Sequence, residues 1–342
     1  MLCPLLFVLE STNVYGQNSS INWASIEDWI RMRCSLNPLE TTVVEWSGPV
    51  YALQPQKQQE YLFDVYGRNL ARCWWNETLD SYLFSSRELQ YYLDKKTKQP
   101  MTKWTNPWTN ETLTVEHTAN DPVQFSVGKI GYTYDLFENG EMASFPSAIN
   151  LFYENPLQND DWSDEDKKIF LPYSHQKFYE STELFKFFVA KKELQNQNID
   201  SAPMHFSWSR FSQFMPWMKT EQMPGSLLFT AEGGKVPANL ESAPEWYQKE
   251  VSDENRIPIY ANAPNCYENS TSITSWVYFG MYFDEYLKGE RFPMPAVEEP
   301  KCKYDLVTEE NRRSFKSMTT PSGANLAQFT FIFLSFLLTT IN

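Results

Sequence analysis

The sequence predicts a mainly β (α+β) protein, in which antiparallel strands form a closed or strongly curved barrel-like sheet with several peripheral helices. Short runs of aromatic and β-branched residues, separated by turn residues, fill the chain between about residues 39 and 152. Within residues 132–145, the dipeptide Asn139-Gly140 predicts a hairpin, because both residues tolerate the positive φ of a type I′ turn. Several antiparallel strands at this spacing favour closure, because an open sheet edge can template aggregation.

The first half of the chain predicts one helix followed by strands. Ser25 stands as an N-cap before the acidic residues Glu27 and Asp28, and Ile26, Trp29 and Ile30 share one helical face. The strands that follow are short and rich in aromatic and branched side chains, over residues 42–46, 59–65, 82–84 and 89–93.

The second half of the chain predicts a mixture of helices and strands. Ser163 and Ser242 each precede an acidic first turn, and Ser242 has the spacing of a capping box with Pro244 in that turn. Apolar residues recur at helical spacing over residues 276–287, before Gly289 as a C-cap. Residues 225–230 predict a strand, with a turn at Gly233-Gly234.

Both ends of the chain predict a secretory route. Residues 326–342 are uncharged and follow the small residues Ser322-Gly323-Ala324, a pattern typical of a glycosylphosphatidylinositol (GPI) attachment signal with the lipid on Ser322. The alternative is a short tail anchor. Residues 2–9 are apolar and predict the core of a signal peptide. We therefore expect a signal peptide at 1–16, one globular domain at 17–297, a stalk at 298–322 and a removed signal at 323–342, which places the protein on the extracellular face of the plasma membrane.

Glycosylation sites and cysteines suit the same compartment. Asn-X-Ser/Thr sequons predict glycosylation of the extracellular chain at Asn18, Asn76, Asn110 and Asn269. Once the leader with Cys3 is removed, an even set of four cysteines remains: Cys34, Cys73, Cys266 and Cys302. Three pairings are open, and we favour Cys34–Cys73 and Cys266–Cys302, because each closes a modest loop within its own half of the chain.

Charge and composition limit the partners. A net charge of -14 argues against binding to a nucleic acid backbone and against direct adsorption to anionic lipid, so membrane attachment requires the covalent anchor. Aromatic residues make up 16% of the chain, which provides ample material for an apolar pocket. The expected partners are a small-molecule ligand and, through the anchor, the membrane.

An ordered series of segments resembles a known family. The series contains residues 86–88, 92–94, 104–109 (WTNPWT), 117–123 (HTANDPV), 207–210 (SWSR), 216–219 (PWMK), 224–225 and 274–279 (TSWVYF). Its order and spacing resemble domain-of-unknown-function family 1838, an uncharacterised group known mainly from bacteria, over about residues 28 to 290. Because no activity is established for that family, the resemblance implies no particular chemistry.

Acid–base and charged residues within or near these segments suggest a catalytic site. His117, Asn120 and Asp121 lie close together and provide an imidazole base with a carboxylate to set its tautomer. The alternative is an Asx-type turn beside a half-buried strand. If Arg87 points into a barrel, it requires a carboxylate such as Asp121 or Glu183, or an anionic ligand. A structural ion pair is the alternative.

Tryptophans and nearby basic residues suggest a ligand-binding site. Trp208, Trp217 and Trp276 suit an apolar ligand or a sugar face, with Arg210 and Lys219 to orient it, whereas ordinary core packing is the alternative. Neither a cofactor nor a metal site is predicted, because the three histidines are far apart in sequence and the dinucleotide, nucleotide-hydrolase and serine-hydrolase loop motifs are absent.

Three functions follow from these alternatives. The leading hypothesis is a GPI-anchored extracellular glycoprotein whose aromatic-lined pocket binds a small hydrophobic or amphipathic ligand. The second is an extracellular enzyme that uses His117 and Asp121, with Glu183, in the same pocket. The third is a cell-surface adhesion or interaction protein.

Overall fold

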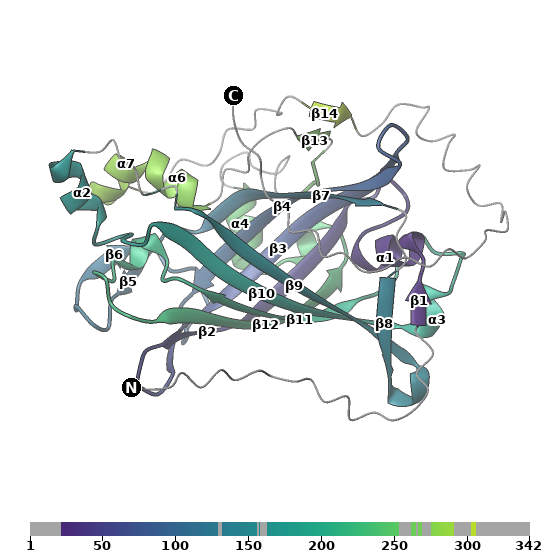
Figure 1. Cartoon of the computed structure of the whole chain (residues 1–342), viewed down its shortest axis with the longest axis horizontal. Helices are drawn as coiled ribbons and strands as arrows, with labels where there is room; N and C mark the ends of the chain where they lie inside the picture. The colour runs from purple at the N-terminus through teal and green to yellow at the C-terminus, as the bar shows by residue number, and fades with distance from the viewer. Residues whose placement is uncertain are drawn as a thin grey trace, which may run out of the picture. The chain divides into compact units, whose positions relative to one another are not determined.

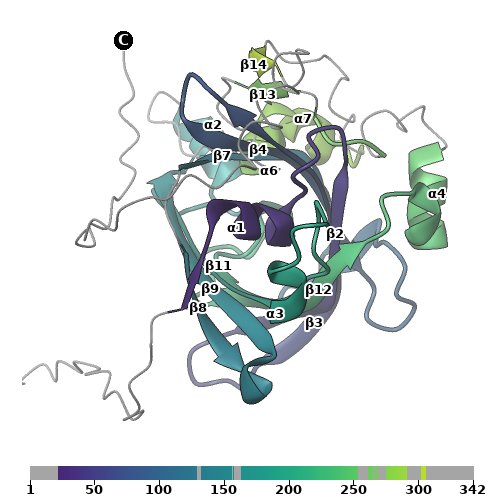
Figure 2. The same ribbon diagram turned by 90° about the vertical axis from the view of Figure 1, so that its right-hand side faces the viewer.

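The computed structural model describes residues 22–128, 132–155, 157, 163–252, 261–264, 266–268, 275–290 and 302–305. Its main body is one antiparallel sheet of ten strands in the order β1-β8-β9-β10-β11-β12-β2-β3-β4-β7 (Figure 1). The sheet is strongly curved, as Figure 2 shows, and forms a half-barrel with β1 and β7 at its edges. The predicted mainly β fold and its curvature are therefore confirmed, and of the two predicted forms the sheet takes the open, curved one.

The strands of this sheet are β1 (Asn22–Ala24), β2 (Thr42–Leu53), β3 (Glu60–Asn76), β4 (Ser81–Leu93), β7 (Thr118–Gly128), β8 (Tyr132–Phe137), β9 (Met142–Glu154), β10 (Phe178–Ala190), β11 (His205–Ser212) and β12 (Ser226–Val236). Two small hairpins pair β5 (Lys103–Thr105) with β6 (Thr112–Thr114) and β13 (Cys266–Glu268) with β14 (Cys302–Asp305). The helices are α1 (Ile26–Arg33), α2 (Asp164–Phe170), α3 (Lys191–Leu194), α4 (Glu245–Ser252), α6 (Ser275–Met281) and α7 (Phe283–Leu287), with 3-10 turns η1 (Glu138–Gly140), η2 (Pro216–Met218) and η3 (Leu240–Ser242). Within these described segments, no helix is both long and apolar enough to span a bilayer.

Local sequence signals account for several of these elements. Ser25 is the N-cap of α1, as predicted, and it forms a capping box with Asp28. The Ser25 hydroxyl accepts a hydrogen bond from the Asp28 N–H, and the Asp28 carboxylate accepts one from the Ser25 N–H. The β8–β9 hairpin reverses at the predicted dipeptide, with φ of 60° at Asn139 and 87° at Gly140. Ser163 caps α2 as predicted, and Gly289 follows α7 with φ of 76°.

Two local predictions are wrong. Gly233 and Gly234 do not form a turn but lie inside β12, where a Cβ on Gly233 would come within 2.1 Å of the Glu45 carbonyl oxygen of β2. The absence of a side chain at this point permits the close approach of the two strands. Ser242 precedes α4 but does not form the expected capping box; its hydroxyl instead donates to the carbonyl oxygens of Pro237 and Asn239.

Helix α1 lies in the opening between the two ends of the curved sheet (Figure 2). The Trp29 ring stacks on Tyr132 of β8 with a centroid distance of 5.3 Å, and it meets Phe125 of β7 edge-on at 5.9 Å. These two strands lie near opposite ends of the strand order. Trp29 therefore bridges the sheet ends through ring contacts, where a closed barrel would have backbone hydrogen bonds.

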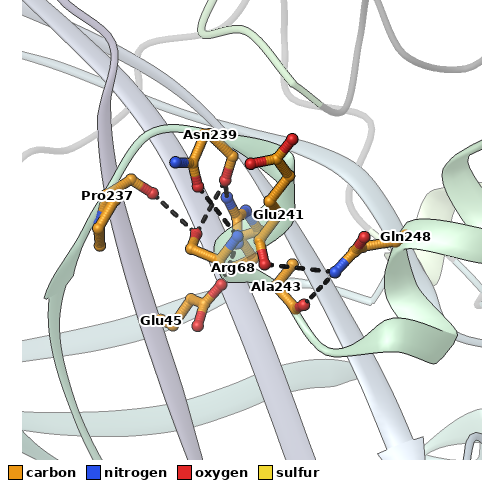
Figure 3. Close-up of polar contacts among 8 residues, drawn as sticks. Glu45, Arg68, Pro237, Asn239, Glu241, Ala243 and Gln248 are labelled. Atoms are coloured by element: carbon orange, nitrogen blue, oxygen red, sulfur yellow. Dashed lines mark hydrogen bonds and ion pairs between the residues drawn. The ribbon is translucent and has the colours of Figure 1, made fainter.

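A buried ion pair fastens α4 to the outer face of the sheet (Figure 3). Arg68 of β3 is fully buried, pairs with Glu45 of β2 and donates to the Asn239 carbonyl oxygen at 3.1 Å. Its guanidinium also lies 5.5 Å from the ring centre of Tyr247 on α4. The outer face of β3 and β4 thus carries its own apolar cluster beneath α4, separate from the cluster inside the half-barrel.

Candidate functional site: a cavity inside the half-barrel

The concave face of the sheet encloses a cavity of about 450 Å³, called the interior cavity below. Alternate residues of each strand face it, as the two-residue period of a β-strand requires. Its wall is formed by Glu88, Gln90 and Tyr92 of β4, by Tyr179, Glu183, Phe185 and Phe187 of β10, by Phe206, Trp208 and Arg210 of β11, and by residues of α1, α6 and the neighbouring strands. The volume lies in the range typical of small-molecule sites.

Aromatic rings form most of the wall from β2, β10 and β11. Trp208 meets Trp46 edge-on at 6.3 Å and is nearly parallel to Phe185 at the same centroid distance. On the α6 side, Trp276 meets Tyr179 edge-on at 4.9 Å. These rings support one another, so the wall is pre-formed and presents both faces and edges to an apolar occupant.

One charged cluster of the wall is satisfied by the protein itself. Arg210 lies opposite Glu183 in the β10–β11 register and forms an ion pair with it at 3.5 Å. Its guanidinium also donates to the Ser181 hydroxyl at 3.0 Å and to the Tyr179 hydroxyl. Burial, the largest single effect, disfavours the charged form of Arg210, but Tyr179, Glu183 and Tyr92 together act against it, and its pKa lies above the ordinary value.

A second charged group of the wall, Arg33, was not anticipated from the sequence. It lies in the last turn of α1, where a basic residue is common because it complements the helix dipole, so its position gave no sign of a site. In the structure its guanidinium lies 4.7 Å from the ring centre of Phe187 and 5.5 Å from that of Phe84. Burial lowers its pKa, while Cys73, Cys34 and Glu88 act in the opposite direction.

The predicted site residues divide into those that line the interior cavity and those that do not. Glu183, Trp208, Arg210 and Trp276 line it. Trp217 is instead buried in the core, where it packs on Phe63, Tyr92 and Trp104 at centroid distances of 5.4 to 5.8 Å. Lys219 has φ of 46° and pairs with Glu111 at 2.7 Å, away from the lining residues.

The predicted acid–base residues lie along β4 and β7. The Nδ1 atom of His117 accepts the backbone N–H of Tyr92 at 3.1 Å, and its ring lies against Tyr91 and Tyr92. His117 therefore serves as an acceptor beside β4 and is not among the lining residues of the interior cavity. Because strand side chains alternate, Arg87 points to the face opposite Glu88 and Gln90, which line the cavity.

The two remaining polar candidates, Asn120 and Asp121, lie on β7. Asp121 pairs with Glu88 in the β4–β7 register, but its side chain and that of Asn120 lie outside the described residues. Among the residues that the structure describes, no cluster of His, Cys, Asp or Glu has the geometry to hold a metal ion.

The cysteines of the first predicted pair lie side by side. Cys34 and Cys73 are buried thiols joined by a hydrogen bond. Burial raises the pKa of Cys73. Burial also acts to raise the pKa of Cys34, but hydrogen bonds from Cys73 and the Ser35 backbone, together with the charges of Lys235 and Arg33, outweigh it and lower that pKa. The second predicted pair, Cys266 and Cys302, falls on the neighbouring strands β13 and β14, and these side chains lie outside the described residues.

Two comparisons with other proteins bear on identity. The search of curated proteins gives no match. The model of the family described as "Protein of unknown function (DUF1838)" matches residues 39–283, more than half of the chain, including most of the sheet that encloses the interior cavity, and the chain therefore belongs to this family.

Proposed function

We propose that this protein binds a small hydrophobic or amphipathic ligand in its interior cavity. The observation that carries the proposal is a cavity of about 450 Å³ whose wall contains the aromatic rings of Trp46, Phe185, Trp208 and Trp276. Polar and charged side chains form a smaller part of the same wall. Pockets of this size and composition suit apolar ligands, with the few polar groups fixing their orientation.

A pair of matched substitutions tests the proposal. Leu151 of β9 lines the interior cavity, whereas Leu184 of β10 is 45% exposed on the outer face of the sheet. Leu151→Trp fills the cavity and should abolish binding of decanol, followed by quenching of tryptophan fluorescence. Leu184→Trp adds the same side chain outside the cavity and should leave binding unchanged. Equal binding by both variants, or no binding by the parent protein, would reject the proposal.

Native mass spectrometry of the secreted protein provides an independent readout. A ligand that occupies an enclosed aromatic cavity should survive purification and appear as a defined mass increment on the folded protein. The Leu151→Trp variant should lose this increment, and the Leu184→Trp variant should retain it. An increment shared by both variants would place the bound molecule elsewhere on the protein.

The cellular setting that we propose is the extracellular face of the plasma membrane, with a GPI anchor. The uncharged segment 326–342 and the small residues at 322–324 support the anchor; both lie outside the described residues. Two of the proposed glycosylation sites have suitable surroundings. Asn110 is exposed in a turn with φ of 59°, and Asn76 begins the turn between β3 and β4.

We further propose that Cys34 and Cys73 form a disulfide in this compartment. Support comes from the hydrogen bond between the two thiols, since a bridge needs two cysteines already within reach. The partner bridge, Cys266–Cys302, is supported by the pairing of β13 with β14, which brings the two backbone segments together.

A further inference from the structure

The guanidinium of Arg33 is a largely buried cation for which the described residues provide no hydrogen-bond acceptor. It lies over the rings of Phe84 and Phe187, and it lines the interior cavity. Within the described part of the chain, Arg33 forms neither an ion pair nor a side-chain hydrogen bond. A guanidinium has five N–H donors, and leaving them unmet in a buried site is strongly unfavourable.

Three other arginines in the described part of the chain each pair with a carboxylate, although the Arg68 Nε atom has no hydrogen-bond partner there. Arg31, two residues earlier on α1, pairs with Asp28 at 2.6 Å and donates to Gln197 at 2.7 Å. Arg68 pairs with Glu45, and Arg210 with Glu183. Arg33 lines the interior cavity as Arg210 does, but unlike Arg210 it has no carboxylate partner among the described residues. A molecule bound in that cavity would supply the missing acceptor.

Glu88 is the carboxylate of the wall that acts on Arg33. Burial lowers the Arg33 pKa, and Glu88 acts in the opposite direction by electrostatic attraction, although the described residues show no ion pair between the two groups. Arginine stays protonated in proteins, so the charge of Arg33 persists despite burial. Its donors therefore remain available for an acceptor from outside, with Glu88 as a neighbouring negative charge.

We propose that Arg33 binds the anionic headgroup of an amphiphile whose apolar body lies against the aromatic wall of the interior cavity. This inference rests on the proposed ligand-binding function and adds the chemical class of the ligand. Carboxylate and phosphate headgroups both match the planar donor fork of a guanidinium, and a bidentate contact would fix the direction in which the ligand enters.

The test compares ligands that share one apolar body. Decanoate, decyl phosphate and decanol are titrated at pH 7.5, where the carboxylate is ionised. The parent protein should bind decanoate or decyl phosphate more tightly than decanol, and the preferred anion identifies the headgroup. Arg33→Met keeps a flexible apolar side chain beside the two phenyl rings and should weaken binding of that anion by about 10- to 100-fold, without weakening the binding of decanol. Circular dichroism confirms that the variant is folded.

Two further variants keep the inference falsifiable. Lys186 on the outer face lies 4.7 Å from the ring centre of Phe137, a similar setting outside the interior cavity, so Lys186→Met is the matched control and should change nothing. Glu88→Gln removes the neighbouring negative charge and should tighten binding of the anion, which gives a prediction of opposite sign if Arg33→Met fails to fold.

The possible failures are distinguishable. The role of Arg33 is overturned if the anions bind no more tightly than decanol, or if Arg33→Met weakens the binding of all three ligands equally. In either case the binding of decanol leaves the proposed binding function standing. If none of the three ligands binds to the parent protein, both the inference and the proposed function fail.

Discussion

Glu183 and Arg210 face each other across β10 and β11, and their side chains form an ion pair of 3.5 Å in the wall of the interior cavity. The hydrogen bonds of Arg210 go to Tyr179 and Ser181, which lie on the same strand as Glu183. The charge of Arg210 is therefore met by the protein, and the pair serves mainly to hold two neighbouring strands in register. Arg33, in contrast, offers its charge to the cavity.

Removal of Arg210 should destabilise the fold. Arg210→Met leaves Glu183 with a poorly solvated charge and Tyr179 without its donor, so the free energy of unfolding should fall by about 3 kcal/mol. Urea unfolding measures this loss. The double variant Arg210→Met/Glu183→Gln should recover part of it, because no unpaired charge remains. A loss below about 0.5 kcal/mol in the single variant would show that the pair contributes only as much as an exposed one.

Gly67 should be required for the placement of Trp46 in the cavity wall. A Cβ at Gly67 would lie 1.9 Å from Cε2 of the Trp46 ring, so Gly67→Ala must displace the indole. Overpacking of this kind typically destabilises by about 1–3 kcal/mol. Thermal unfolding and tryptophan emission provide the measurement. Gly128→Ala is the control, because its Cβ would meet nothing within 4 Å, and an equal effect in both variants would contradict the explanation.

The fold was predictable where local signals agree with the final structure. The capping box of Ser25 and Asp28 and the Asn139-Gly140 turn act through nearby backbone atoms, so they can be recognised in sequence alone. β10 and β11 were not predicted. The segment of β10 (FYESTELFKFFVA) places phenylalanines at both odd and even positions, which obscures the two-residue period that marks a strand.

The site was predictable only in part, for a physical reason. Trp208 and Trp276 stood out as aromatic residues, but nothing local separated them from Trp217, which belongs to the same apolar cluster but does not line the cavity. The difference is set by which strands become neighbours. Arg33 was missed because a basic residue at a helix C-terminus already has a sufficient explanation, and its lack of an acceptor is a tertiary property.

Phosphatidylinositol-specific phospholipase C should release the protein from the cell surface. The prediction rests on the uncharged segment 326–342 and the small residues at 322–324. Release is measured by immunoblotting of the medium, with a known GPI-anchored protein as the control for enzyme activity. Retention of this protein while the control is released would favour a tail that spans the membrane.

Intact-mass analysis should detect two disulfides in the mature protein. Reduction after unfolding should expose four thiols, and peptide mapping should link Cys34 to Cys73. Each bridge is expected to stabilise by about 2–4 kcal/mol, so the paired variant Cys34→Ala/Cys73→Ala should unfold at a lower urea concentration. Two or more free thiols in the unfolded, non-reduced protein would contradict the two-bridge arrangement.

Lys235 should make stability depend on pH in the neutral to alkaline range. Its ammonium nitrogen donates to the carbonyl oxygens of Arg31 and Cys34 at 2.6 Å and to the Ser201 hydroxyl at 2.8 Å, at the end of α1. Burial, the largest effect, lowers the pKa of Lys235 to about 7, against about 10.4 in an unfolded chain. Between these values the unfolded state holds the proton and the folded state releases it, so stability rises with pH, by at most about 1.4 kcal/mol per pH unit.

We therefore expect the wild type to gain stability relative to Lys235→Met as the pH increases from about 7 to 9. The measurement is urea unfolding under reducing conditions, which keep Cys34 and Cys73 from forming a disulfide. Below about pH 6.5 the difference between the two proteins should level off, because both states of the wild type are then protonated. A difference that stays flat above pH 7, or falls, would mean that Lys235 remains charged at the end of α1.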